Sequence, residues 1–421
     1  MLSKIFADKN GKSIEKRCRL YILFSGGLSA AFSVVILIIA ARTVSIEDTG
    51  ILTIAIAVAK LLLNIGKYGM RNYQVTDTNK VGFSEWLYSR CITVFAMMLC
   101  SVIYVVYQKA FNGYYDYKGV MVILVCLVYA LESFEDIYTG HCQKEGRLDV
   151  ASYIQSIRYV WLYLIFGLGL FFTQNMLFTT VASVIVSAII VCYYGFRVIK
   201  YYNIKLVKPQ GTLVRKILMD CFPLCVMNFM LIYLSNAPKY EIDRLYGSDV
   251  QAYYGFISMP IFTISLFSGF IFQPQLVNLS TSWTEKIYSR FWKIVRRQFV
   301  YIFGVSAVCV FAGWAVGIPV LSALYGVDDL EKYKTIFVVL LIGGAGTAVV
   351  NFITALLVIF RKQRSILYAY LATSAAVFIS IKFAIQSYGI VGASVDTTVL
   401  IWILTAVLAA LFFRTAWKEQ N

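Results

Sequence analysis

The stretch NFMLIYLSNAPKYEIDRLYGSDVQAYYGFISMP, residues 228–260, joins two hydrophobic segments through a short polar crossing. A weaker copy, ARTVSIEDTGILTIAIAV, occupies residues 41–58. A shift of 202 positions, from 42 to 244, aligns Arg42 with Arg244, Glu47 with Asp249, and Gly50 with Ala252. The chain contains twelve apolar segments, six in each half, and each copy joins the first and second segments of its half. This placement indicates an internal repeat of the kind found in duplicated membrane proteins.

The composition indicates a membrane protein. Of its 421 residues, 60% are hydrophobic and only 14% are charged. A water-soluble chain of this length would have too little polar surface to cover its core. No loop is long enough to fold as a separate soluble domain. The nine cysteines are interpreted as small hydrophobic residues and not as a disulfide set. The sequence therefore predicts an all-α polytopic membrane protein.

Apolar runs long enough to cross a bilayer set the number of helices. They begin near residues 20, 49, 86, 119, 153, 177, 213, 250, 294, 335, 366 and 388. The first run is read as a retained helix, since no small-residue cleavage site follows it. The largest connection, residues 197–216, is basic and is broken by Pro209 and Gly211. We expect twelve helices, in an N-terminal lobe of residues 1–208 and a C-terminal lobe of residues 209–421.

The distribution of Lys and Arg orients these helices, because cytoplasmic loops carry the excess of positive charge. Of the 38 Lys and Arg residues, 27 fall on the side that holds both termini and eight on the other. The remaining three, Lys60, Lys67 and Arg158, fall inside apolar runs. Both termini are therefore predicted to be cytoplasmic. This asymmetry accounts for the net charge of +16, so no nucleic-acid partner is needed, and the basic loops should lie against anionic membrane lipids.

Three segments resemble a known family. They are NAPKYEIDRLYGSDVQAYYGF at 236–256, IYTGHCQKEGRLDVASY at 137–153, and YGIVGASVDTTVLIWIL at 388–404. With them the chain resembles the bacterial polysaccharide and O-antigen flippases of the multidrug/oligosaccharidyl-lipid/polysaccharide exporter superfamily. The resemblance implies two six-helix lobes around a central cavity that opens alternately to the two sides of the bacterial inner membrane. Lys239 departs from the pattern, where arginine is expected, and would lose bidentate phosphate geometry.

The resemblance also implies a substrate and partners. The substrate would be a polyprenyl (undecaprenyl)-pyrophosphate-linked oligosaccharide repeat unit, moved from the cytoplasmic to the periplasmic leaflet for O-antigen or other surface polysaccharide. Other polysaccharide assembly proteins would be partners.

A polar face on the second predicted helix is the strongest candidate for substrate binding. Thr53, Lys60, Asn64, Lys67 and Arg71 follow spacings of 7, 4, 3 and 4, which places them on one side of a helix. Lys60 lies deep in its apolar run, where a charge facing lipid costs about 2.5–3.5 kcal/mol. We expect it to face a polar cavity and to bind the anionic pyrophosphate. The predicted cavity residues are Lys60, Asn64, Lys67, Arg71, Asn228, Asn236 and Lys239.

Acidic residues gather on one face of the fourth predicted helix, at Glu132, Glu135 and Asp136. We expect them to pair with Lys67 and with Arg158 of the fifth helix, while no acid lies level with Lys60. The same acids could instead carry a coupling cation. The predicted residues for ion pairing or coupling are Glu132, Glu135, Asp136, Arg158, Asp220 and Asp396.

Prolines and glycines in the seventh and eighth predicted helices indicate kinks or breaks. These residues are Pro223, Gly255, Pro260, Gly269 and Pro274.

Some functions are disfavoured by what the sequence lacks. The only histidine is His141, and there is no phosphate-binding Gly-Lys-Ser/Thr loop, so neither a metal, a cofactor nor a catalytic residue is predicted. Two alternatives stay open. A cation-coupled multidrug antiporter of the same superfamily would use Asp220, Asp396 or the acids of the fourth helix. A membrane polysaccharide polymerase would be expected to have a large outer loop, whereas the outer loops here are short.

Overall fold

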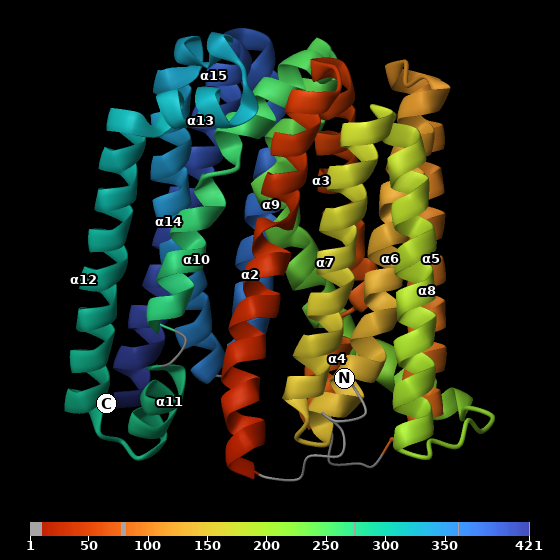
Figure 1. The fold of residues 1–421 in the computed structure, drawn as a ribbon. Helices are drawn as coiled ribbons and strands as arrows, with labels where there is room; N and C mark the ends of the chain where they lie inside the picture. The colour runs from red at the N-terminus through yellow and green to blue at the C-terminus, as the bar shows by residue number, and fades with distance from the viewer. Residues whose placement is uncertain (1–10, 77–80, 273–274, 361, 421) are drawn as a thin grey trace. The chain divides into compact units, whose positions relative to one another are not determined.

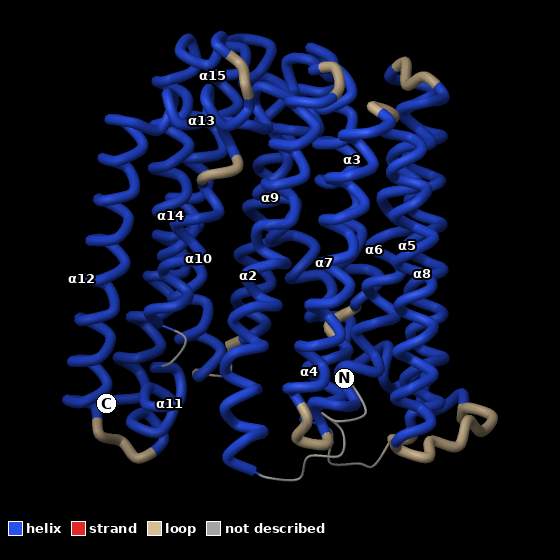
Figure 2. The backbone as a smooth tube through the Cα atoms, viewed as in Figure 1, coloured by secondary structure: helices blue, strands red, loops and turns tan. Residues whose placement is uncertain are grey.

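The computed structural model describes residues 11–76, 81–272, 275–360 and 362–420, and within these ranges it contains helices and no strand (Figures 1 and 2). Contacts divide the chain into a first compact unit, Met1–Phe229, and a second, Met230–Asn421. The lobe boundary expected after residue 208 stays a prediction. The start of the helix that follows it, from Gly211, packs with the first unit.

Each unit is built from long helices with a few short ones between them. The first unit holds α2 (Gly11–Thr43), α3 (Ile46–Lys67), α4 (Met70–Thr76), α5 (Phe83–Asn112), α6 (Asp116–Lys144), α7 (Leu148–Thr173), α8 (Met176–Tyr201) and the beginning of α9 (Gly211–Ser258). The second holds the rest of α9, α10 (Ile261–Phe272), α11 (Leu276–Thr284), α12 (Tyr288–Ala312), α13 (Ile318–Tyr325), α14 (Lys334–Ile359) and α15 (Gln363–Gln420). A π-helical turn, Gly313–Gly317, and a 3-10 turn, Asp328–Tyr333, flank α13.

The expected twelve-helix membrane fold is confirmed. Nine segments of the described residues are long and apolar enough to cross a membrane. Two of these, residues 211–269 and 364–418, contain a non-helical break, at Gly247 and Gly389, so each provides two crossings. Helix α6, with 29 residues, has the length of its neighbours and completes the twelve. The chain is a multi-pass membrane protein.

Both copies of the sequence repeat lie where one helix ends and the next begins. Ser45 caps α3, and its hydroxyl accepts a hydrogen bond from the Asp48 amide at 3.0 Å. The position 202 residues later is Gly247, where the chain breaks α9 with φ 83° and ψ 178°. That conformation is essentially restricted to glycine. The repeat therefore marks the same helix junction in each half.

The predicted breaks in the seventh and eighth helices are only partly correct. The chain turns at Pro260, between the end of α9 and the start of α10. Helical backbone runs through Pro223, Gly255 and Gly269. The helix is therefore not broken at Pro223, and a kink there stays a prediction. Pro274 lies outside the described residues.

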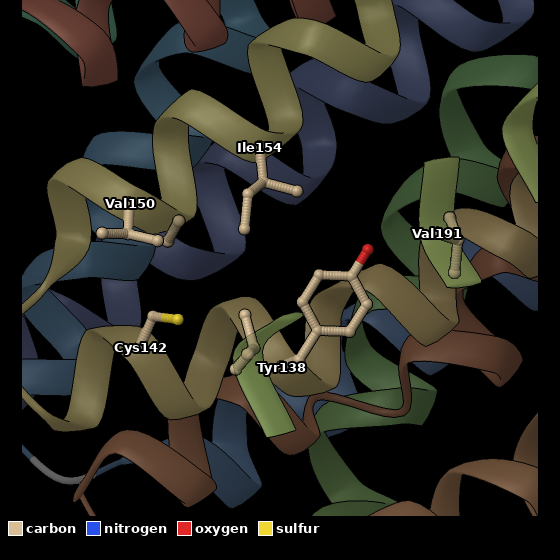
Figure 3. Close-up of a cluster of buried hydrophobic side chains, with 7 residues drawn as sticks. Tyr138, Cys142, Val150, Ile154 and Val191 are labelled. Carbon is tan, nitrogen blue, oxygen red and sulfur yellow. The ribbon is translucent and has the colours of Figure 1, made fainter. Parts of the chain in front are cut away.

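Helix α6 is the centre of the first unit and packs against α3, α5, α7 and α8 (Figure 1). Near its C-terminal end, buried Tyr138 and Cys142 of α6 meet Val150 and Ile154 of α7 and Val191 of α8 (Figure 3). This apolar cluster fixes the rotation of α6. The next two turns towards its N-terminus carry the acids, which consequently face α3, α5 and α7.

Candidate functional site

The acids of α6 form a buried layer inside the first unit. Glu132, Glu135 and Asp136 are each less than a tenth exposed. Their spacing of three and four residues places them on one face of the helix. Buried carboxylates need cationic partners, and all three have them.

Two cations neutralise the glutamates. The Lys67 ammonium, at the end of α3, lies 2.6 Å from Glu132 Oε1. The Arg158 guanidinium, on α7, lies 3.0 Å from Glu132 Oε2 and also pairs with Glu135. The hydroxyl of Tyr159 donates to Glu132 Oε2 at 3.0 Å. Glu132 therefore joins α3 to α7 through α6.

Asp136 pairs with two arginines. The Lys and Arg count places both of them on the cytoplasmic side, and one of them, Arg71, was also expected on the polar face of α3. Arg90 of α5 is fully buried and lies 3.0 Å from Asp136, and Arg71 lies 3.3 Å from it. The expectation that Arg71 continues the polar face of α3 is wrong. Helix α3 ends at Lys67, the chain turns through left-handed Tyr68 and Gly69, and Arg71 lies on α4.

Sequence reasoning missed Arg90. Its only signal was an arginine one turn inside a predicted apolar helix. Arg90 is held in place by the close approach of α3 at Gly66. The Gly66 carbonyl accepts hydrogen bonds from both Arg90 and Thr93. A Cβ at Gly66 would lie 2.6 Å from Ser133 Oγ and 2.7 Å from Met97 Sδ. Only glycine lets α3 pack this close to α5 and α6.

Lys60 lies apart from these ion pairs. Its ammonium donates to Ser33 Oγ of α2 at 2.9 Å, and among the described residues this is its only hydrogen bond. Lys60 is half-buried. Among the described residues Lys60 forms no ion pair with the acids of α6. Asn64 donates to the carbonyls of Lys60 and Leu61, on its own helix.

The charges of the ion pairs, taken together with nearby Lys60, do not cancel. We call the following eight residues the charge network: Lys60, Lys67, Arg71, Arg90, Arg158, Glu132, Glu135 and Asp136. Five bases against three acids leave a surplus of two positive charges. The acid side chains are at most 9% exposed, whereas Lys67 and Arg71 are 34% and 28% exposed. An approaching molecule therefore meets the bases first.

The remaining predicted residues of the first unit lie on α9. Asp220 is exposed and accepts a hydrogen bond from the Tyr73 hydroxyl at 2.7 Å. Asn228 is exposed.

Three predicted residues belong to the second unit. Asn236 donates to the carbonyl of Ile232 at 3.0 Å. Lys239 is buried, and Asp396 of α15 accepts from Ser380 at 2.9 Å.

Sequence reasoning also missed a buried acid. Asp149, in the first turn of α7, is fully buried. Arg17 of α2 lies 3.2 Å from it and Arg147 lies 3.0 Å from it. The signal was the Arg-Leu-Asp sequence at 147–149, inside a segment quoted for its family resemblance. These contacts tie the start of α2 to the start of α7.

Solved structures define the class of this fold. An inward-facing multidrug resistance MATE family transporter of the MOP superfamily is similar over 93% of this chain and 96% of that chain, with TM-score 0.70 and 11% identity. Lipid II flippase MurJ, in an inward closed conformation, is similar over 94% of this chain and 87% of that chain, with TM-score 0.66 and 13% identity. A MOP superfamily transporter from Pyrococcus furiosus is similar over 99% and 97%, with TM-score 0.53 and 11% identity. The fold is that of the MOP superfamily transporters.

A family model identifies the chain more closely. The chain belongs to the family described as polysaccharide biosynthesis protein, whose model matches residues 18–278, more than half of its length. The resemblance seen at 137–153 and 236–256 is thereby confirmed, while 388–404 lies beyond the matched residues. No protein among the curated sequences matches it significantly.

Proposed function

We propose that this protein is a flippase that moves a polyprenyl (undecaprenyl)-pyrophosphate-linked oligosaccharide from the cytoplasmic to the periplasmic leaflet of a bacterial inner membrane. It works by alternating access, with both termini in the cytoplasm, and it supplies O-antigen or other surface polysaccharide synthesis. Its activity is transport and not catalysis. The family, the fold and the likeness to a lipid II flippase support this proposal.

The observation that carries the proposal is the positive surplus of the charge network. A pyrophosphate diester bears two negative charges, and the network offers two uncompensated positive ones. Lys67 and Arg71 remain partly accessible while their acid partners are covered. Lys60 is bound only to a neutral hydroxyl among the described residues, so its charge is available to an anion. Charge-assisted hydrogen bonds to such a ligand contribute about 1.5–3 kcal/mol each.

The alternative of a cation-coupled drug antiporter would need accessible acids. The α6 acids are buried and paired, which argues against a coupling role for them and leaves exposed Asp220 as the accessible acid of the antiporter alternative. In the P. furiosus neighbour, a reverse polarity of the binding pocket suggests a different function for that protein.

Deleting the gene tests the proposal directly. We expect complete lipid-linked repeat units to accumulate on the cytoplasmic leaflet while surface polysaccharide is lost. Full-length polymer accumulating inside the cell would contradict a flippase. Unchanged polysaccharide with lost drug export would establish the antiporter instead.

Lys60 variants test the charge network within the same assay. Lys60→Ala should stay at normal abundance, because the Ser33 hydroxyl it releases can bond to water or to its own helix. It should nevertheless lose about 10- to 100-fold of transport, the equivalent of one charged hydrogen bond, and Lys60→Arg should retain most of it. The control Lys109→Ala removes a lysine from a partly exposed ion pair with Asp116 and should transport normally. Full transport by Lys60→Ala would exclude Lys60 from binding.

A further inference from the structure

A depression of about 650 Å³ lies in the second unit between the start of α12 and the end of α15. Its lining consists of Ser289, Trp292, Lys293, Arg296 and Phe413. The volume is within the range of small-molecule sites. These residues are separate from the charge network, which belongs to the first unit.

The aromatic wall of this depression is firmly built. The ring of Trp292 stacks on Phe413, with centroids 6.0 Å apart and planes at 2°. Trp292 also contacts fully buried Phe412 edge-on at 5.7 Å. Phe412 in turn stacks on Phe360, at the end of α14, with centroids 5.5 Å apart. The wall is therefore anchored in the core of the unit and does not depend on a ligand for its shape.

Two cations complete the depression. Lys293 and Arg296 lie three residues apart on the same side of α12 and are exposed. Within the part of the chain that the structure describes, neither forms an ion pair or a hydrogen bond, and no acid lines the depression. The hydroxyl of Ser289, one turn before Lys293, adds a third donor. The lining therefore offers two positive charges beside an aromatic surface, which suits an anion attached to an apolar body.

The depression lies where the apolar surfaces of both helices end. Beyond Arg296 on the same side of α12, Val300 is 68% and Phe303 is 48% exposed. On α15 the exposed apolar residues run from Val399 through Ile403 and Val407 to Phe413, and Arg414 follows. Exposed apolar strips of this length on a membrane protein face lipid chains. The two cations therefore lie at the level of the headgroups, on the side that the Lys and Arg count predicts to be cytoplasmic.

We propose that this depression is a binding site for an anionic phospholipid. The phosphate binds to Lys293, Arg296 and Ser289, the glycerol region lies against Trp292 and Phe413, and the acyl chains follow the apolar strips of α12 and α15. A free phosphate ion would leave the aromatic wall and the strips unused. A zwitterionic headgroup would bring an ammonium next to two cations, and none of the described lining residues is an acid that could receive it. The bound lipid would join two helices far apart in the sequence.

Lipid binding to the purified full-length protein tests this site independently of transport. Native mass spectrometry would follow titration with phosphatidylglycerol and with phosphatidylcholine. Lys293→Ala/Arg296→Ala should weaken phosphatidylglycerol binding about 30-fold, because each basic residue at an anionic surface contributes about 1 kcal/mol and 1.4 kcal/mol is tenfold. The control Arg290→Ala/Arg297→Ala removes two exposed arginines of the same helix that do not line the depression. It should bind as the wild type does.

Each other outcome would overturn the proposal in a distinct way. Equal binding by the Lys293→Ala/Arg296→Ala variant would place the lipid elsewhere. Equal affinity for phosphatidylcholine would remove the role of the cations. Displacement of phosphatidylglycerol by millimolar inorganic phosphate alone would show a phosphate site without lipid recognition. Lys293→Arg/Arg296→Lys keeps both charges and should retain binding, which separates lost charge from misfolding.

Discussion

Replacing Arg158 by methionine should destabilise the first unit, because among the described residues Arg158 alone forms an ion pair with Glu135. The guanidinium is 1% exposed and joins Glu132, at 3.0 Å, to Glu135. Without it, Glu132 keeps the Lys67 ammonium at 2.6 Å. Among the described residues the Glu135 carboxylate keeps no ion-pair or hydrogen-bond partner. A buried charge stranded in this way costs about 3–5 kcal/mol.

A double-mutant cycle separates this stranded charge from lost packing. Glu135→Gln leaves Arg158 paired with Glu132 and removes one charge-assisted contact, a cost of about 1.5–3 kcal/mol. Arg158→Met/Glu135→Gln contains no stranded carboxylate at position 135. The double variant should therefore be more stable than Arg158→Met alone, although it carries one more substitution.

Equilibrium unfolding by SDS in mixed micelles, together with abundance in the membrane, measures the four proteins of the cycle. Arg297→Met, which removes an exposed arginine, is the matched control and should change stability by less than about 0.5 kcal/mol. A double variant whose destabilisation equals the sum of the two singles would refute the pairing. Normal stability with lost transport in either single variant would move these residues into the transport mechanism.

Two further predictions concern topology and packing. In a cysteine-free background, a cysteine at exposed Gly211 should be labelled only from the cytoplasm and one at exposed Asp249 only from outside; labelling of both from one side would overturn the twelve-helix topology. Gly66→Ala should lower stability by about 1–3 kcal/mol in the same SDS assay, since its Cβ would lie 2.6 Å from Ser133 Oγ. Gly26→Ala, whose Cβ would contact nothing within 4 Å, is its control, and equal stability of the two variants would contradict the close approach of α3.

The sequence determined the features that depend on neighbours along the chain. The hydrophobic composition indicated that the chain lies in a membrane. The apolar runs gave the number of helices, because a helix needs about 20 apolar residues to span a bilayer, whatever its partners. The repeat at residues 41–58 and 228–260 located a helix junction in each half, at Ser45 and Gly247. The presence of charges at Lys60, Lys67 and Arg158 within apolar runs also indicated where polar contacts must form inside the protein.

Only the tertiary structure decided which charges meet. Arg90 and Asp136 are 46 residues apart, and their contact depends on how α5 and α6 are rotated against each other and on the missing side chain of Gly66. Arg71 left the predicted face because a left-handed turn at Tyr68 and Gly69 separates it from α3. The depression beside Trp292 and Phe413 likewise needs two helices more than a hundred residues apart. Helix packing fixes such pairs, because periodicity places a residue on a face but does not say which helix that face will meet.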